Sequence, residues 1–208
     1  MRPLPRLHAV TDARVLSLED LGIRVAAIAA AGSGVALHVR DRASGGKRLT
    51  ELTRRFLALA GPPEAAILVN GHPEIAQGTG AQGVQLGSRD LRAPDARGIF
   101  PTGWIGRSVH SESEAEAAAL EGADFLLAGS VFPTASHPAA RPQGVELIRR
   151  CAGFGLPVIA IGGVRRQHIP DLRSAGAYGV AGISALWDDP DPAAAAVAML
   201  DAWSDTGE

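Results

Sequence analysis

The stretch Trp104-Ile105-Gly106-Arg107-Ser108-Val109-His110-Ser111 passes from a short apolar run into a cluster of polar side chains. Ser111 and Glu114 have the spacing of a capping box, so a helix is predicted to begin directly after His110. A strand that leads straight into a helix is typical of parallel α/β proteins, in which ligands bind at the carboxyl ends of the strands. His110 is therefore the first candidate for a functional residue.

The same strand and helix pattern recurs along the chain. Apolar runs rich in Val, Ile and Leu predict strands at residues 7–11, 35–40, 66–70, 83–86, 104–108, 124–128, 157–161 and 179–183. Helices are predicted at 18–31, 47–60, 72–80, 111–121, 142–152, 165–175 and 190–203, with a short helix or turn at 88–99. Eight such units in 208 residues predict a TIM (β/α)8 barrel, an α/β fold, as one domain over residues 1–208; a doubly wound open sheet is the alternative.

Composition narrows the class of protein. Hydrophobic residues make up 46% of the chain and charged residues 20%, which is enough for a core. The net charge of -2 predicts no nucleic-acid partner. The Ala-rich run at 25–39 is broken by Gly32 and Gly34, and the N-terminus lacks a signal-type apolar segment, so no membrane association and a cytoplasmic location are expected. Cys151, the single cysteine, is expected to be buried.

Polar side chains recur at the predicted strand exits. They are Thr11, Asp12, His38, Arg40, Arg42, Asn70, Gln85, Arg107, Ser108 and His110. Burying them separately is costly, so together they predict one shared polar pocket. The structural alternatives are a loop cap for Asp12, pairing with backbone for Gln85 and a satisfied core position for His38.

Two further strand exits suit an anion. Gly162-Gly163 follows the seventh predicted strand and is expected to lead into a helix, so its amides can approach a phosphate. Ile183-Ser184 follows the eighth strand, and these two loops form the phosphate site of many TIM barrels. A plain tight turn is the alternative for the two glycines.

The residues do not suggest a metal site. Asp90 is the one acid near the fourth strand exit, and Gly71 rather than a second carboxylate follows Asn70. His8, His72, His137 and His168 lack a zinc spacing, and most are expected on the surface or in loops.

Seven motifs in this order resemble the thiamine phosphate synthase and TenI superfamily over nearly the whole chain. They are Leu7-His8-Ala9-Val10-Thr11-Asp12, Leu37-His38-Val39-Arg40-Asp41-Arg42, Val69-Asn70-Gly71, Gly83-Val84-Gln85-Leu86, Gly106-Arg107-Ser108-Val109-His110, Gly129-Ser130-Val131-Phe132-Pro133-Thr134 and Pro157-Val158-Ile159-Ala160-Ile161-Gly162-Gly163. The resemblance implies a TIM barrel.

Within this superfamily the motifs are similar to the TenI-type branch. Synthases have a Gln-Leu-Arg-Glu-Lys run where this chain has residues 38–42, and an Asn-Asp pair, which helps to hold magnesium, where this chain has Asn70-Gly71. The loop after Pro133 ends in Thr-Lys in synthases, whereas here Thr134 is followed by Ala135, Ser136 and His137. TenI-type thiazole tautomerases have His-Ile-Arg-Glu-Arg, Asn-Gly and Gly-Arg-Ser-Val-His. The resemblance implies isomerisation of a carboxythiazole phosphate to the aromatic thiazole, with no metal or cofactor.

The resemblance also implies roles for individual residues. His110 would be the catalytic acid/base, because imidazole, with an unperturbed pKa of about 6.5, accepts and donates protons near neutral pH. His38 would be a second proton carrier or a pocket wall, and Arg40 would bind the substrate carboxylate. The other expected substrate-binding residues are Arg42, Asn70, Gln85, Ser108 and Thr134, with Gly162, Gly163, Ile183 and Ser184 at the phosphate.

Two other functions remain open at this point. A magnesium-dependent thiamine phosphate synthase is motivated by Asp90 and the shared loops, and a non-catalytic ligand-sensing barrel by the missing synthase residues. The expected partner is a phosphorylated thiazole carboxylate. A homo-oligomer is also open, as is a lid formed by residues 133–144.

Overall fold

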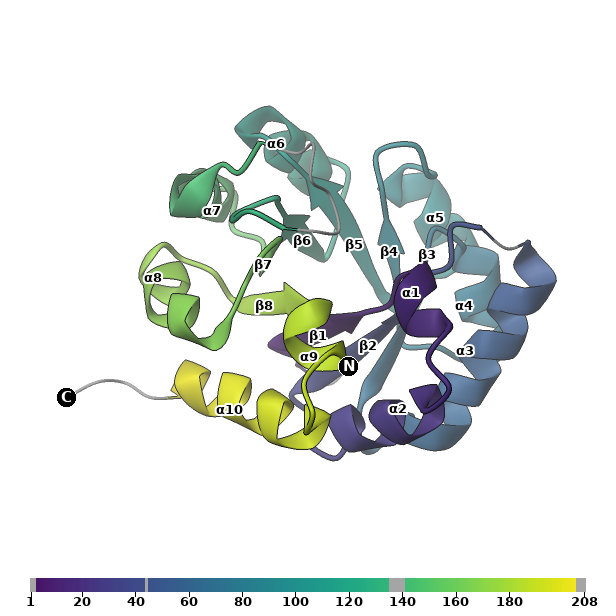
Figure 1. Cartoon of the computed structure of the whole chain (residues 1–208). Coiled ribbons are helices and arrows are strands. Elements are labelled where there is room, and N and C mark those ends of the chain that lie inside the picture. Colours follow the sequence, from purple (N-terminus) through teal and green to yellow (C-terminus); the bar gives the residue numbers. More distant parts are fainter. Residues whose placement is uncertain (1–2, 44, 135–140, 205–208) are drawn as a thin grey trace.

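The protein forms a closed barrel of eight parallel strands surrounded by helices (Figure 1). The computed structural model describes residues 3–43, 45–134 and 141–204. The strands follow one another around the barrel in chain order, from β1 to β8, and β8 pairs with β1. The predicted single-domain TIM barrel is therefore confirmed, and the open doubly wound sheet is wrong.

The eight strands are short and almost wholly buried. They are β1 (Leu7–Val10), β2 (Val35–Val39), β3 (Ala66–Asn70), β4 (Gly83–Leu86), β5 (Trp104–Val109), β6 (Phe125–Ala128), β7 (Val158–Ile161) and β8 (Gly179–Gly182). Every predicted strand is present, and each of its ends differs from the prediction by one residue or less. Burial on both faces explains why their sequences are continuously apolar instead of alternating.

The helices form the outer layer. They are α1 (Ala13–Leu16), α2 (Leu21–Ala29), α3 (Gly46–Ala60), α4 (Pro73–Thr79), α5 (Ala93–Ile99), α6 (Glu112–Leu120), α7 (Gly144–Ala152), the 3-10 helix η1 (Arg166–His168), α8 (Ile169–Ser174), α9 (Ser184–Trp187) and α10 (Pro192–Ser204). The four-residue helices α1 and α9 were not predicted, because neither is long enough to show helical periodicity. The short helix expected within 88–99 is α5.

The buried apolar side chains form two clusters, one between the helices and the barrel and one inside the barrel. Residues such as Val25, Phe56 and Leu147 pack between helices and strands. A smaller cluster fills the barrel itself, including Phe125 and Ile159. Successive strand residues point alternately outward and inward, so Leu7 packs outside, whereas His8 and Val10 belong on the inner side. The barrel interior is thus filled by side chains, and a ligand can enter only at its mouth.

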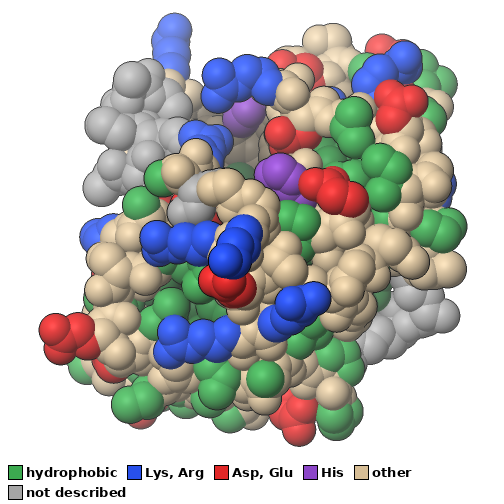
Figure 2. Space-filling view, turned by 90° about the vertical axis from the view of Figure 1, so that its right-hand side faces the viewer, with side chains coloured by type: hydrophobic (Ala, Val, Ile, Leu, Met, Phe, Trp, Pro, Cys, Tyr) green, Lys and Arg blue, Asp and Glu red, His purple; other side chains and the backbone are tan. Residues whose placement is uncertain are grey.

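The outer surface carries charges of both signs. Basic, acidic and apolar side chains are interspersed on the face in Figure 2. Cys151 is buried, as predicted, and burial raises the pKa of its thiol to about 11. Within the described ranges, every helix is too short or too polar to cross a lipid bilayer.

Candidate active site

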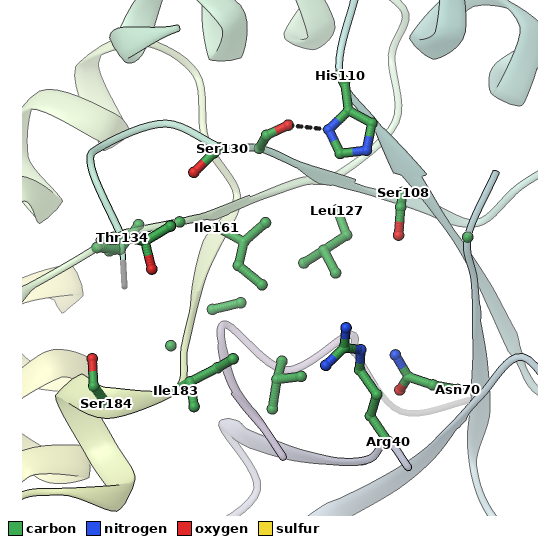
Figure 3. A pocket seen from close by; sticks show the side chains of 18 of the residues that line it. Arg40, Asn70, Ser108, His110, Leu127, Ser130, Thr134, Ile161, Ile183 and Ser184 are labelled. Carbon is green, nitrogen blue, oxygen red and sulfur yellow. Dashed lines mark hydrogen bonds between the residues drawn. The ribbon is translucent and has the colours of Figure 1, made fainter. Parts of the chain in front are cut away.

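A cavity of about 250 Å³ opens at the carboxyl ends of the strands (Figure 3). Ten of the twelve residues expected to bind or act on the substrate line it: Arg40, Arg42, Asn70, Ser108, His110, Thr134, Gly162, Gly163, Ile183 and Ser184. Of the other strand-exit residues, Thr11, Asp12 and Arg107 do not line it, and Asp12 caps α1, which was its structural alternative. Val10, Leu127, Ile161 and Ala181 provide an apolar surface between the polar groups. The cavity therefore has the composition of a small-molecule site, with a few convergent polar groups on apolar walls.

His38 and Gln85 do not line this cavity, which corrects their placement among the pocket residues. Both side chains are buried below it, with His38 fully buried and Gln85 at 1% exposure. The alternation of side chains along β2 and β4 turns them into the barrel interior. They can reach a ligand only through the residues that they contact.

The cavity is also lined by Gly87, Ser88 and Ser130, which were not among the predicted site residues. Ser130 follows β6 and is the nearest polar group to the strand exit there. The rule that singled out the other strand exits would have found it. Its Oγ donates to the carbonyl oxygen of Phe132 at 3.2 Å, which shapes the loop beyond β6.

His110 is held at the rim of the cavity by three contacts. Its Nδ1 donates to the carbonyl oxygen of Gly129, a short bond drawn in Figure 3. Its backbone N–H donates to Glu114 Oε2 at 2.7 Å, and its carbonyl oxygen accepts from Gln143 Nε2 at 2.6 Å. Because a carbonyl oxygen can only accept, Nδ1 carries the hydrogen and Nε2 of the neutral ring keeps its lone pair. His110 is therefore arranged to accept a proton at Nε2.

The predicted capping box at the start of α6 forms only in part. Ser111 Oγ accepts from the backbone N–H of Glu114 at 3.2 Å, as expected. The Glu114 carboxylate, however, accepts from the N–H of His110 rather than from that of Ser111. The cap of α6 thus also fixes the backbone that carries the candidate catalytic histidine.

Arg40 is fixed at the end of β2 by its backbone. The backbone N–H of Arg40 donates to Thr11 Oγ1 at 2.8 Å, and the Thr11 hydroxyl lies 3.0 Å from the carbonyl oxygen of His38 and 3.1 Å from that of Arg40. Burial, and then the charge of Arg42, lower the pKa of the Arg40 guanidinium. A cation that is partly desolvated in this way favours an anionic ligand group.

Arg107 has a different role. Its Nη1 donates to the carbonyl oxygens of Gly87 and Leu91, at 3.0 and 3.1 Å. It stabilises the loop after β4 and does not line the cavity.

Three polar side chains from neighbouring strands form a chain of contacts through the barrel. His8 Nε2 lies 3.0 Å from the carbonyl oxygen of Pro5, and His8 Nδ1 lies 2.8 Å from His38 Nε2. His38 Nδ1 lies 3.3 Å from the side-chain amide of Asn70. His8, which lies in the first predicted strand, is fully buried and is thus not among the histidines on the surface or in loops.

Gln85 supports Ser108 from below. Gln85 Nε2 donates to Ser108 Oγ at 3.0 Å, which leaves the serine O–H group available to donate. Gln85 Oε1 is buried and has no hydrogen-bond partner among the described residues. A Cβ atom at Gly106 would collide with this oxygen, so a glycine is required beside it.

Gly162 and Gly163 form the opposite side of the cavity. Their φ angles are +101° and +63°, and a Cβ atom on either residue would collide with the segment that follows β6, at Ser130 and at Pro133 respectively. This turn leads through Val164 into η1, whose N-cap is Arg165, and then into α8, so the predicted passage into a helix is confirmed. The helix whose first residues line the cavity is α9, through Ser184 and Ala185.

The acidic groups offer little to a metal ion. Asp90 Oδ2 accepts from the backbone N–H of Gly87 at 2.7 Å. Within the described residues, no three His, Cys, Asp or Glu side chains gather closely enough to hold a metal ion. The positions Ala135, Ser136 and His137, which differ from the synthase pattern, lie outside the described residues, as does much of the expected lid.

Comparisons with known proteins agree with this architecture and sequence. The family model described as thiamine monophosphate synthase matches residues 7–186. The chain belongs to this family. The predicted superfamily is thereby confirmed, while the TenI-type branch within it is not decided.

Individual members of the thiamine monophosphate synthase family match the chain along most of its length. The thiamine-phosphate synthase of Salinispora tropica is 37% identical over 97% of this chain and 99% of its own length. A putative thiamine-phosphate synthase of Geobacter sulfurreducens is 37% identical over 93% of this chain and 92% of its own. The solved thiamine phosphate pyrophosphorylase of Pyrococcus furiosus superimposes with a TM-score of 0.82 at 29% identity, covering 98% of this chain and 97% of that one.

Proposed function

We propose that this protein is an enzyme of thiamine phosphate biosynthesis that binds a phosphorylated thiazole. Membership of the thiamine monophosphate synthase family supports the pathway. The cavity supports the ligand, since Gly162, Gly163 and Ser184 suit a phosphate at one end. Arg40 at the other end suits a carboxylate.

Two reactions fit such a ligand, and different observations favour each. The names of the relatives favour the transferase, thiamine-phosphate synthase, and by that criterion it is the better-supported reaction. The geometry of the cavity favours the isomerase, a thiazole tautomerase. A ligand-sensing barrel without turnover is the third candidate, and the assay below also tests it.

The transferase reaction depends on magnesium, so the carboxylates available to bind that ion matter for it. Magnesium in such sites is bound by one or two carboxylates together with substrate phosphates. Asp90 is one carboxylate near the mouth, and Gly71 faces it without adding a second. This set has one carboxylate fewer than the pair that the resemblance implies for synthases, so it fits a bound magnesium ion poorly.

One observation carries the isomerase, namely the hydrogen bond from His110 Nδ1 to the Gly129 carbonyl oxygen. It leaves Nε2 as the basic nitrogen at the edge of the cavity. In the proposed reaction, Nε2 takes a proton from a ring carbon, and the electron pair of that C–H bond moves into the ring system. The imidazolium, stabilised by the same carbonyl oxygen, then gives a proton to the exocyclic carbon. One C–H bond breaks and one forms, so no further reactant is needed.

The deciding experiment compares the two reactions with the same purified protein. One assay follows conversion of the exocyclic carboxythiazole phosphate tautomer. The other follows formation of thiamine phosphate from pyrimidine pyrophosphate and thiazole phosphate, and both are run with and without magnesium. Tautomer conversion that is unaffected by a chelator identifies the isomerase, whereas magnesium-dependent thiamine phosphate formation alone identifies the synthase. Tight binding without turnover in either assay identifies a sensor.

A further inference from the structure

The buried pair His8 and His38 has no part in the proton transfer proposed above. Burying two imidazole rings inside a barrel costs free energy unless their nitrogens are hydrogen-bonded. The pair connects the Pro5 carbonyl oxygen, below β1, to the amide of Asn70, which lines the cavity. We call this set of contacts the His8–His38–Asn70 relay. Its three side chains come from β1, β2 and β3, which pair as neighbours.

The position of each hydrogen in the relay follows from the Pro5 carbonyl oxygen. That oxygen can only accept, so His8 Nε2 carries a hydrogen, and in a neutral ring His8 Nδ1 then has a lone pair. His8 Nδ1 must therefore accept from His38 Nε2, 2.8 Å away. This requirement leaves His38 Nδ1, the nitrogen next to Asn70, without a hydrogen.

The amide of Asn70 must match that lone pair. Asn70 Oδ1 lies 3.3 Å from His38 Nδ1, and an oxygen facing a lone pair makes no hydrogen bond. A half-turn of the amide about its last bond exchanges its oxygen and nitrogen, so the NH2 group can donate to His38. We propose that His8 and His38 are positioning residues that hold the Asn70 amide with its carbonyl oxygen facing the cavity, so that the site favours a ligand with a hydrogen-bond donor there.

A second arrangement of hydrogens also satisfies every contact, but it needs an additional proton. If His8 were an imidazolium, His8 Nδ1–H could donate to His38 Nε2, and His38 Nδ1–H could donate to Asn70 Oδ1. Burial lowers the pKa of His8 to about 4, and burial followed by the charge of His8 lowers the pKa of His38 well below its usual range. The Arg40 cation acts on His38 in the same direction. The neutral arrangement is therefore the one expected near pH 7.

The consequence for recognition is a defined pattern of hydrogen-bonding groups. Asn70 presents an acceptor, Ser108 presents an O–H donor because its oxygen already accepts from Gln85, and Arg40 presents a cation. Figure 3 shows Arg40 and Asn70 side by side, with Ser108 above them. The inference rests on the proposed function only in placing a phosphorylated thiazole in this cavity. The complementary ligand has a protonated ring nitrogen or a hydroxyl group beside its anionic group.

Long-range proton–nitrogen NMR of the full chain tests the relay without any substrate. At pH 7, both buried histidines should show the neutral form with hydrogen on Nε2, and one Asn70 amide proton should couple to His38 Nδ1. Hydrogen on Nδ1 of His38, or a charged His8, would overturn the proposal. Because no ligand is added, this result is independent of whether the proposed reaction takes place.

Two variants at the far end of the relay test its effect on binding. His8→Leu removes the acceptor for His38 Nε2–H, whereas His8→Asn keeps an oxygen near the position of Nδ1. For His8→Leu, the Kd of an imidazole ethyl phosphate, which has the ring N–H that thiazole phosphate lacks, should rise roughly 3- to 10-fold, the equivalent of one neutral hydrogen bond, while the Kd of thiazole phosphate should not rise. The Kd of His8→Asn should stay near that of the wild type.

Equal weakening in both variants would overturn the proposal, since a merely structural role predicts it. The buried-core variant Ile159→Val, outside the relay, controls for general loosening of the interior. If His8→Leu does not fold, the NMR measurement on the wild-type protein still decides the question. Absence of thiazole phosphate binding together with the expected tautomers would count against the proposed function and not against the relay.

Discussion

Gly71 lies opposite Asp90, so that a Cβ atom at position 71 would stand 3.4 Å from Asp90 Oδ2. A carboxylate introduced there would share a cation with Asp90. The φ angle of +81° at this position is one that Asp and Asn tolerate better than most residues. We therefore expect Gly71→Asp to bind Mg²⁺ roughly tenfold or more tightly than the wild type, because one added charge about 4 Å from a divalent ion contributes on the order of 2 kcal/mol in water.

Isothermal titration with MgCl2 measures this gain. Gly71→Asn is the matched control, because it has the same shape and backbone requirement without the charge. Equal affinities in the two variants would mean that the carboxylate introduced at position 71 does not share a cation with Asp90.

Replacing His110 removes the proposed base. His110→Asn should lower the rate of tautomer conversion by about 10²- to 10⁴-fold, the usual contribution of a general acid or base. His72→Asn serves as the control, because His72 is bonded to Glu74 and does not line the cavity. Steady-state rates at saturating substrate measure the effect, and an undiminished rate in the His110 variant would remove this residue from the mechanism.

Arg40→Lys tests whether a guanidinium fork binds the substrate carboxylate. Lysine keeps the charge but loses the paired N–H geometry. The Kd of the carboxythiazole phosphate should rise about tenfold, while that of the thiazole phosphate without the carboxyl group should change little. A parallel loss for both ligands would instead place Arg40 at the phosphate.

The Gly162-Gly163 turn has no room for side chains. In Gly163→Ala, the new methyl group meets Pro133 and Phe132 at a positive φ angle, so phosphate affinity and thermal stability should both fall. Destabilisation of about 1 to 3 kcal/mol is expected for strain of this kind. Gly98→Ala, in α5 with open space around the position, should be neutral or stabilising. Thermal unfolding with and without inorganic phosphate compares the two variants.

The buried His8 makes stability depend on pH. Its pKa is about 4 in the folded chain, against 6.5 in the unfolded chain, so only the unfolded chain takes up this proton between those values. The free energy of unfolding should therefore be highest above pH 6.5 and fall by about 3 kcal/mol through this residue as the pH drops to about 4. Urea unfolding at pH 7, 5.5 and 4.5 measures the slope. The slope should be shallower for His8→Leu, and an identical slope in that variant would exclude His8 as its source.

The barrel could be predicted from the sequence because each strand is a local apolar run. The run Ala66–Asn70 needs no knowledge of its neighbours to be recognised, and the barrel's chain-order topology then brings the strand ends together. The same reasoning found Arg40, Ser108 and His110 from three separate strands. Helices α1 and α9 escaped it, because a single turn leaves no periodic pattern.

The sequence could not show how deeply each polar side chain lies inside the barrel. His8 and His38 are 30 residues apart, and nothing local to either residue indicates that its partner is another histidine. His38 and Gln85 follow the same strand-exit rule as Asn70, and all three side chains point inward, yet only Asn70 lines the cavity, while His38 and Gln85 are buried. A prediction of which layer a side chain occupies requires the register between strands, which depends on the whole barrel.

In Figure 3, the apolar side chains of Leu127 and Ile161 lie between the side of the cavity that holds Thr134 and Ser184 and the side that holds Arg40 and Asn70. A compound that occupies one end alone leaves the other end free for a second compound. The cavity is therefore suited to fragment linking, in which an anion for the glycine turn and a small heteroaromatic acid for Arg40 are found separately. A short hydrocarbon bridge over the apolar surface would then join them, with the gain in affinity set by effective concentration.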